Sequence, residues 1–367
     1  MAIEFSNVMA FAQTSPDLYT ATKEYARNCS LERKGIASAF SAKSKEDMED
    51  LINKEFAIEL SEQVGYTSKK FGETKEAMRR YAGLTQVKEF ANSIKDTMID
   101  MILPEVLLSG ALPFIAEIKT ADLGDSIKFE IDNNQLFTVS KAGYKKRHTN
   151  IQKLYKTTET MVGENHEITI GADLFEILTG QANIAKDAMK SALSIEASML
   201  YESYDAFKTA MNALTGNLVI ANYSEPSLIK LCETVTAYNQ GRKAVIIGTP
   251  VALKSILPAN ANYRYSLTDD YVKLGHVRTF NGYDVIPMEQ VANYLSNDYS
   301  LKLDDTKIYV VSPASDKIVK IGVFGGTFTH VDGNYDNANK MVLSTTEKAW
   351  NTTVITNSVG GAVIALS

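Results

Sequence analysis

The 367-residue sequence is poor in the residues that build small chemical sites. It contains two cysteines, Cys29 and Cys232, and four histidines. Two cysteines so far apart in the chain exclude a disulfide framework and favour a reducing compartment. None of the histidines has another histidine or a cysteine at metal-ligand spacing, so the sequence predicts no metal site.

An excess of basic residues and a long hydrophobic run are also missing. The 38 lysines and arginines are outnumbered by 44 acidic residues, which argues against a dedicated nucleic-acid-binding protein. Charged residues and prolines interrupt the most apolar stretch, residues 98–118, so no membrane-spanning helix is expected. The first 17 residues lack the basic region and apolar core of a signal peptide, and we expect a cytosolic origin.

What remains is the composition of an ordinary globular protein. Hydrophobic residues make up 45% of the chain and charged residues 22%, which excludes a largely disordered chain. The 21 glycines and 8 prolines are too few for a collagen-like or low-complexity architecture. The length favours two or three domains, or one elaborate domain.

The first hundred residues predict helices. Ser44 and Asp47 precede an amphipathic pattern and indicate a helix N-terminus at Ser44. A second helical pattern runs from about Thr74 to Leu103, where Pro104 is expected to end it. Periodicity is weak before Ser44. This part is either an arm that gains order from a partner or a helical cap on the main domain.

Residues 114–170 predict strands and a long hairpin. Residues 126–131 alternate polar and apolar side chains, and 136–139 and 151–161 are further strand candidates. Six basic residues and no acidic residue lie between positions 141 and 156, so the hairpin has a basic tip. This tip fits either phosphates or an acidic neighbour, and the acidic chain favours the neighbour. An isolated hairpin is marginal in water, so it is expected to lean on another surface, and a second subunit is one candidate. The candidate interface residues at the tip are Lys141, Tyr144, Lys145, Lys146 and Arg147.

Residues 173–214 predict one very long helix, with Asp173 as its cap and Gly180 as a point where it can bend. At 1.5 Å per residue this helix would span roughly 60 Å. The chain then changes to an α/β pattern. We expect helices at 226–238 and 250–257 and strands at 244–247, 283–287, 307–311 and 317–323, followed by closing strands at 327–331, 341–346, 352–356 and 362–366.

No group of residues carries the pattern of a catalytic or cofactor site. The strand-turn-helix at Thr249 lacks the lysine and the glycine spacing of a P-loop. Residues 164–167 indicate a solvated turn rather than metal ligands. Two acidic pairs are interpreted as exposed loop carboxylates rather than cation ligands: Asp269–Asp270 and Asp304–Asp305. We therefore predict no enzyme, no cofactor and no metal.

The order of the segments is more informative than any single motif. A helical arm, a long hairpin, a very long helix, an α/β lobe and closing strands together resemble the major capsid proteins of tailed bacteriophages, which have the Hong-Kong-97-type fold. Local sequence agrees with this resemblance: residues 244–257 (AVIIGTPVALKSIL) look like the strand-then-helix of the family's axial domain, and residues 281–287, 308–311 and 317–322 look like its following strands.

The resemblance implies an α+β fold with this division: an N-terminal helical arm (1–100), the first part of the peripheral domain (101–225) with an extended loop (about 120–168) and a spine helix (about 173–214), an axial domain (226–324), and closing strands of the peripheral domain (325–367).

The resemblance also implies self-assembly into pentamers and hexamers of an icosahedral head that encloses double-stranded DNA. The expected partners are copies of the chain, with scaffolding, portal and decoration proteins, and no membrane. The expected location is the virion, assembled in the cytoplasm of the host bacterium. Two alternatives stay open: an encapsulin-type nanocompartment shell, and a cytosolic α/β enzyme with its site near Thr249 or Asp269–Asp270.

Overall fold

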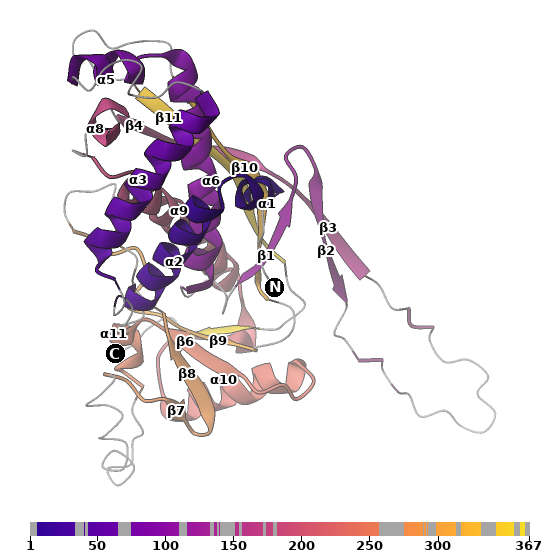
Figure 1. Cartoon of the computed structure of the whole chain (residues 1–367). Helices are drawn as coiled ribbons and strands as arrows, with labels where there is room; N and C mark the ends of the chain where they lie inside the picture. The colour runs from indigo at the N-terminus through magenta and orange to yellow at the C-terminus, as the bar shows by residue number, and fades with distance from the viewer. Residues whose placement is uncertain are drawn as a thin grey trace.

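A computed structural model describes residues 6–33, 40, 43–64, 75–109, 116–132, 136–137, 139, 151–153, 156–171, 174–178, 182–256, 275–288, 290, 292, 299–312, 317–331, 343–355 and 360–363. It confirms the α+β class, with a helical layer over a four-stranded sheet, a separate six-stranded sheet, and a projecting hairpin (Figure 1). Within the described residues, no helix is both long and apolar enough to cross a membrane.

The N-terminal region consists of helices, as predicted. They are α1 (Ser6–Thr14), α2 (Pro16–Arg33), α3 (Lys45–Val64), α5 (Lys75–Ala82) and α6 (Thr85–Ser109). The cap of α3 is confirmed, because the Ser44 hydroxyl accepts the N–H of Asp47 at 3.1 Å.

The prediction of one helix that ends at Pro104 is wrong at two points. The pattern is divided between α5 and α6 near Gly83, and α6 runs through Pro104 to Ser109. Proline removes one backbone hydrogen bond from a helix interior. Its neighbours Leu103, Val106 and Leu107 are fully buried, and their burial outweighs that loss.

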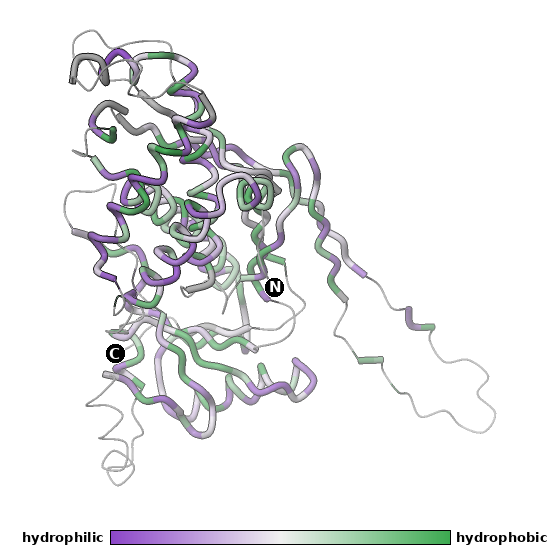
Figure 2. The backbone as a smooth tube through the Cα atoms, viewed as in Figure 1, coloured by the Kyte–Doolittle hydropathy of each residue, from purple (hydrophilic) through white to green (hydrophobic). Residues whose placement is uncertain are grey.

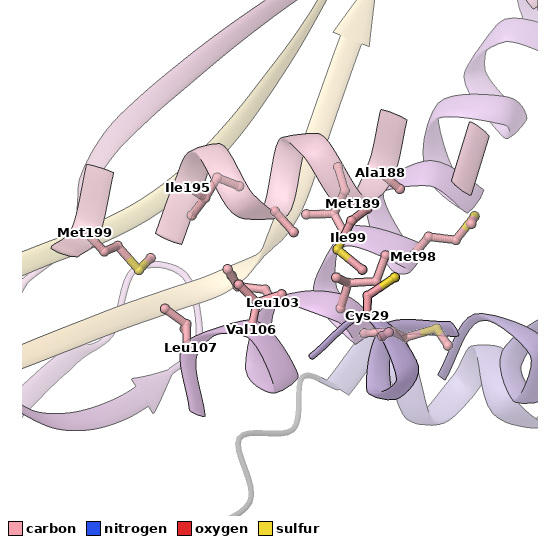
Figure 3. Close-up of a cluster of buried hydrophobic side chains, with 14 of the residues drawn as sticks. Cys29, Met98, Ile99, Leu103, Val106, Leu107, Ala188, Met189, Ile195 and Met199 are labelled. Carbon is pink, nitrogen blue, oxygen red and sulfur yellow. The ribbon is translucent and has the colours of Figure 1, made fainter. Parts of the chain in front are cut away.

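The described part of the N-terminal region forms the cap rather than a free arm. Its buried residues join α6 and α9 (Ile184–Asn212) in one core, seen in close-up in Figure 3, where Cys29, Met98 and Met189 come from three different helices. Two polar contacts fix α3 against the start of α9. The Glu49 carboxylate accepts the amide of Asn183 at 2.8 Å, and Asn53 accepts the N–H of Ile184 at 3.0 Å.

The predicted 40-residue helix is shorter than expected at its N-terminal end. A five-residue helix, α8 (Leu174–Leu178), precedes α9, which starts only at Ile184. Asn183 is its N-cap and accepts the N–H groups of Ala185 and Lys186. Since that side chain and Asn53 satisfy the first orphan donors, the helix begins there. Gly180 lies outside the described residues.

The four-stranded sheet has the order β1 (Ala116–Ala121), β10 (Val319–Val331), β11 (Leu343–Val354), β4 (Glu164–Gly171). The predicted strands 317–323 and 327–331 form one strand, because β10 continues through a bulge between Phe324 and Phe328, and the predicted closing strands 341–346 and 352–356 form the single strand β11. The predicted turn at 164–167 is also wrong: these residues begin β4, which pairs with β11.

The six-stranded sheet has the order β5 (Val219–Ile220), β12 (Gly361–Val363), β9 (Ile308–Val311), β6 (Val245–Gly248), β8 (Tyr283–Pro287), β7 (Thr279–Phe280). The short helix η1 (Gly216–Leu218) precedes it, and α10 (Glu225–Tyr238) and α11 (Pro250–Leu253) pack on its separate core. Its membership differs from the predicted axial segment 226–324. The six-stranded sheet includes β5, which precedes residue 226, and β12, which follows residue 324. Residues 319–324 instead belong to β10 of the four-stranded sheet.

Helix α6 takes the place of a strand at one edge of the four-stranded sheet. Strand β1 ends at Ala121, opposite Phe324, and among the described residues no other strand pairs with β10 on that side further along. There the N–H groups of Thr327 and Thr329 donate to Asp100 (2.8 Å) and Asp96 (2.7 Å) of α6. The four residues from Asp96 to Asp100 advance about 6 Å along the helix and two strand residues advance about 6.8 Å, so the two spacings are similar.

Lys348 completes this buried joint from β11. Its ammonium lies 2.8 Å from Asp100 and 2.9 Å from the carbonyl of Gly325, and both charged side chains are at most 1% exposed. Gly325 has a positive φ of 59°, and a Cβ there would lie 2.9 Å from that of Leu123. The bulge that aims these groups at α6 therefore favours glycine.

Replacing Asp100 by alanine tests this joint. The variant leaves the Lys348 ammonium buried without its carboxylate, and we expect the free energy of unfolding to fall by about 3–5 kcal/mol. Asp100→Asn keeps an acceptor for Thr327 and is expected to lose less, while Asp50→Ala, at an exposed position of α3, changes little. Urea unfolding measures all three. A loss below about 1 kcal/mol in Asp100→Ala would contradict the role of this pair.

Candidate subunit interface

The predicted hairpin is present and projects from the body of the molecule (Figure 1). Strands β2 (Ser126–Asp132) and β3 (Lys156–Val162) pair antiparallel, with Asp132 opposite Lys156. Residues 133–155 connect them and are called here the distal extension. The predicted strand at 136–139 is not found in its described residues, and the one at 151–161 starts only at Lys156.

The base of the hairpin is anchored to the outer face of the four-stranded sheet. Ile127, Phe129 and Met161 form a small core with Phe324 and Ala349. Consecutive residues of β10 point to opposite faces, so Phe324 meets the hairpin while Val323 faces the main core. The hairpin and the helical layer thus lie on opposite sides of the same sheet.

Two lysines close this small core around the ring of Phe129. The ammonium of Lys119 lies 4.4 Å from the ring centroid and that of Lys320 lies 5.9 Å from it. Lys320 is almost fully buried and pairs with Glu117 at 2.6 Å. Burial raises the pKa of Glu117, but the two lysines outweigh that effect, so its pKa lies below the usual value.

The distal extension has no such core in its described residues. Leu136, Phe137, Val139 and Ile151 are all more than half exposed, and Val139 is 95% exposed. Figure 2 shows these hydrophobic pieces far from the body. Several large apolar side chains on one projecting segment form a surface that needs a partner to exclude water.

The five predicted tip residues, Lys141, Tyr144, Lys145, Lys146 and Arg147, lie outside the described residues. The structure therefore gives no contact for them. The two remaining basic residues of the 141–156 segment are described. Lys153 is exposed, and Lys156 lies 3.7 Å from Glu130 across the hairpin.

The other candidate site residues of the sequence have local structural roles where the structure describes them. The Thr249 hydroxyl caps α11 by accepting the N–H of Ala252. Asp304 accepts from Thr306 and pairs with Lys307 at 3.7 Å, and Asp305 accepts the amide of Gln290. Asp269 and Asp270 lie outside the described residues. Elsewhere in the described chain no three metal-ligating side chains gather.

One polar contact between the sheet and α9 was missed by sequence reasoning. His166 of β4 stacks on Trp350 of β11 with ring centroids 3.6 Å apart, and the indole N–H donates to Glu202 of α9 at 2.8 Å. The contact was not predicted because residues 164–167 were interpreted as a turn and not as a strand. The single tryptophan of the chain was the sequence feature that could have pointed to it.

Comparison with known proteins gives one match in sequence. A family model described as "SPbeta prophage-derived putative capsid protein YonB" matches residues 17–363. No curated protein matches the chain in sequence.

Solved capsid structures are similar to the chain at low identity. The mature capsid of bacteriophage PhiM1 is 12% identical, with 70% of this chain and 86% of that chain covered and a TM-score of 0.43. The capsid of Cyanophage P-SCSP1u is 10% identical, with coverages of 70% and 88% and a TM-score of 0.44. The capsid of a native GTA particle is 13% identical, with coverages of 70% and 90% and a TM-score of 0.45.

The Phe129→Ala variant tests the anchor of the hairpin. Loss of a buried ring from a packed core costs about 3–5 kcal/mol, and here we expect that cost to appear as release of the hairpin from the sheet. Hydrogen exchange should quicken in β2 and β3 and stay unchanged in α9. The matched control is Phe137→Ala, since that exposed ring lies beyond the anchor. Equal exchange rates in the two variants would refute the anchor.

Proposed function

The chain belongs to the family of SPbeta prophage-derived capsid proteins that the YonB description names, and from that premise we propose that it self-assembles into the pentamers and hexamers of an icosahedral head. Membership of this family makes it a structural protein of a viral capsid rather than an enzyme. The prophage origin in the family description also favours a container for a genome over a cargo compartment. The observation that carries self-assembly is the projecting, apolar distal extension.

An extended segment without a core is costly to order in a single chain. Fixing each residue costs about 1–2 kcal/mol of backbone entropy. Burial of Leu136, Phe137, Val139 and Ile151 against a second copy would offset this cost, at about 25 cal/mol for each Å² of apolar surface removed from water. We expect these four side chains to be buried when subunits meet, and each subunit in a closed shell to be held by several such contacts.

The charge of the hairpin tip also favours contact with a second subunit. The segment 141–156 carries six basic residues and no acidic residue, whereas the whole chain has a net charge of −6. A basic tip is therefore attracted to another copy of the same acidic chain. The acidic balance also suits a wall that encloses double-stranded DNA without gripping it. Scaffolding, portal and decoration proteins remain proposed partners.

Deletion of residues 136–150 tests the role of the extension. We expect the variant to fold, because the anchor around Phe129 and the helical layer are retained, and to form no closed shells in negative-stain electron microscopy. A matched control replaces the same residues by a glycine-serine segment of equal length, which separates chain length from side-chain chemistry. Normal shells from both variants would exclude a role of the extension in assembly.

The charge of the tip is tested separately by the combined variant Lys141→Gln, Lys145→Gln, Lys146→Gln and Arg147→Gln. We expect slower assembly at low salt and a weaker dependence of the rate on ionic strength, because steering by charges is screened by salt. Light scattering measures the rate. As control, Lys23→Gln and Lys54→Gln change exposed lysines of the helical layer. An assembly rate in the tip variant with the wild-type salt dependence would rule out steering by the tip.

A further inference from the structure

Asp96 is a buried acid at the joint between α6 and the four-stranded sheet. Its side chain is only 6% exposed. One carboxylate oxygen accepts the N–H of Thr329 at 2.7 Å, and the other makes a very short hydrogen bond with the hydroxyl of the same threonine. That hydroxyl lies 2.9 Å from the hydroxyl of Thr346 on β11. A chain of three side chains therefore runs from the helix across two strands.

The ion pair of this joint is made by Asp100 and not by Asp96. Asp100, one turn further along α6, pairs with Lys348 of β11 at 2.8 Å. In the described part of the chain, no ion pair joins Asp96 itself to a lysine or arginine. Lys95, the residue before Asp96 on α6, is also buried, and its ammonium interacts electrostatically with Asp96 and with Asp187 of α9.

The remaining charged residues of the neighbouring strands point away from the joint. His330 follows the inward-facing Thr329, and Glu347 precedes the inward-facing Lys348. Both therefore lie on the outer face of the sheet, with the His330 ring 3.4 Å from the Glu347 carboxylate. The charged groups that face Asp96 are thus Asp100, Lys95 and Lys348, with Asp187 acting on Lys95.

We propose that Asp96 is a proton-controlled fastening between α6 and β10. In the protonated form the carboxyl donates to the Thr329 hydroxyl, which in turn donates to Thr346, and Asp100, paired with Lys348, is the one ionised acid of α6 at the joint. In the ionised form the proton has gone to solvent, the Thr329 hydroxyl donates to the carboxylate, and two buried negative charges one helical turn apart share the joint. Docking of α6 is therefore stronger with the proton bound.

The direction of titration agrees with this geometry. Burial, followed by the nearby charge of Asp100, raises the pKa of Asp96 to about 7, against the hydrogen bonds from Thr329, which lower it. The folded chain therefore holds a proton that the unfolded chain releases near its ordinary pKa of about 3.9. A raised pKa in an acid means that stability is present at low pH and is lost as pH rises through the range up to about 7.

Strand β10 carries both this fastening, at Thr329, and the hairpin anchor, at Phe324. Strand β1 follows α6 in the chain, pairs with β10 up to Phe324, and carries Lys119 beneath the hairpin ring Phe129. Any effect of pH on shells rests on the proposed function. The proton switch itself acts within one chain and is tested on unassembled subunits.

Unfolding of the unassembled full chain between pH 5 and pH 7 is the direct test. For wild type we expect the unfolding equilibrium constant to rise on the order of 50-fold more than in Asp96→Asn. The asparagine amide can donate to Thr329 as the protonated acid does, so this variant should lack that component of the pH dependence. Asp50→Asn, at an exposed site on α3, is the matched control and should behave as wild type. The same pH dependence in wild type and Asp96→Asn would overturn the proposal.

A second measurement does not depend on how the variant folds. The carboxyl carbon of Asp96 in the wild-type chain can be followed by NMR, with assignment from the loss of its signal in the variant or from backbone correlation. Titration in the neutral range supports the fastening. Titration near pH 4, as for an exposed aspartate, would refute it even if the variant failed to fold. Both results leave the capsid proposal untouched, because neither involves a second subunit.

Discussion

The docking of α6 against the open edge of β10 is the contact on which the rest of the subunit depends. A strand edge with unpaired N–H groups must find acceptors, and here Asp96 and Asp100 supply them at a spacing that matches the strand. Removing two carboxylates and the Lys348 ammonium from water is costly, and a buried ion pair is weak evidence for stability. What it does supply is registration, because only one rotation and one height of α6 satisfy both donors. The core shared with α2, α3 and α9 is then built on a helix whose position is fixed.

The same sheet serves two purposes on its two faces. The inner face carries the helical layer, and the outer face carries the small core that anchors Phe129. The anchor holds only the base of the hairpin, since the paired strands end at Asp132 and Lys156. Beyond them the exposed Phe137 and Val139 have no apolar neighbours among the described residues that bury them. The anchor thus fixes where the extension leaves the body, which is what the proposed contact with another subunit requires.

Sequence reasoning succeeded where a local signal decides the structure. The cap at Ser44, the helix α10 and the buried strand β6 follow from capping, periodicity and short apolar runs. It failed where distant partners decide. Burial overrides Pro104 in α6, and Asn53 of α3 helps to set the start of α9. In the candidate interface, the paired strands of the hairpin could be predicted from alternation, while the basic tip stays a prediction. The anchoring role of Lys320 could not be predicted, because a lysine in a strand is usually exposed.

The described part of the chain uses its buried charged residues and its exposed apolar residues in two different places. The buried charged residues Asp96, Asp100 and Lys348 join helix α6 to the four-stranded sheet. Leu136, Val139 and Ile151, which are among the chain's most exposed apolar residues, lie on the distal extension. Catalysis requires a pre-organised cavity, whereas assembly requires a stable body with segments whose order comes from neighbours. A capsid subunit satisfies the second requirement, and the physical organisation of this chain follows from it.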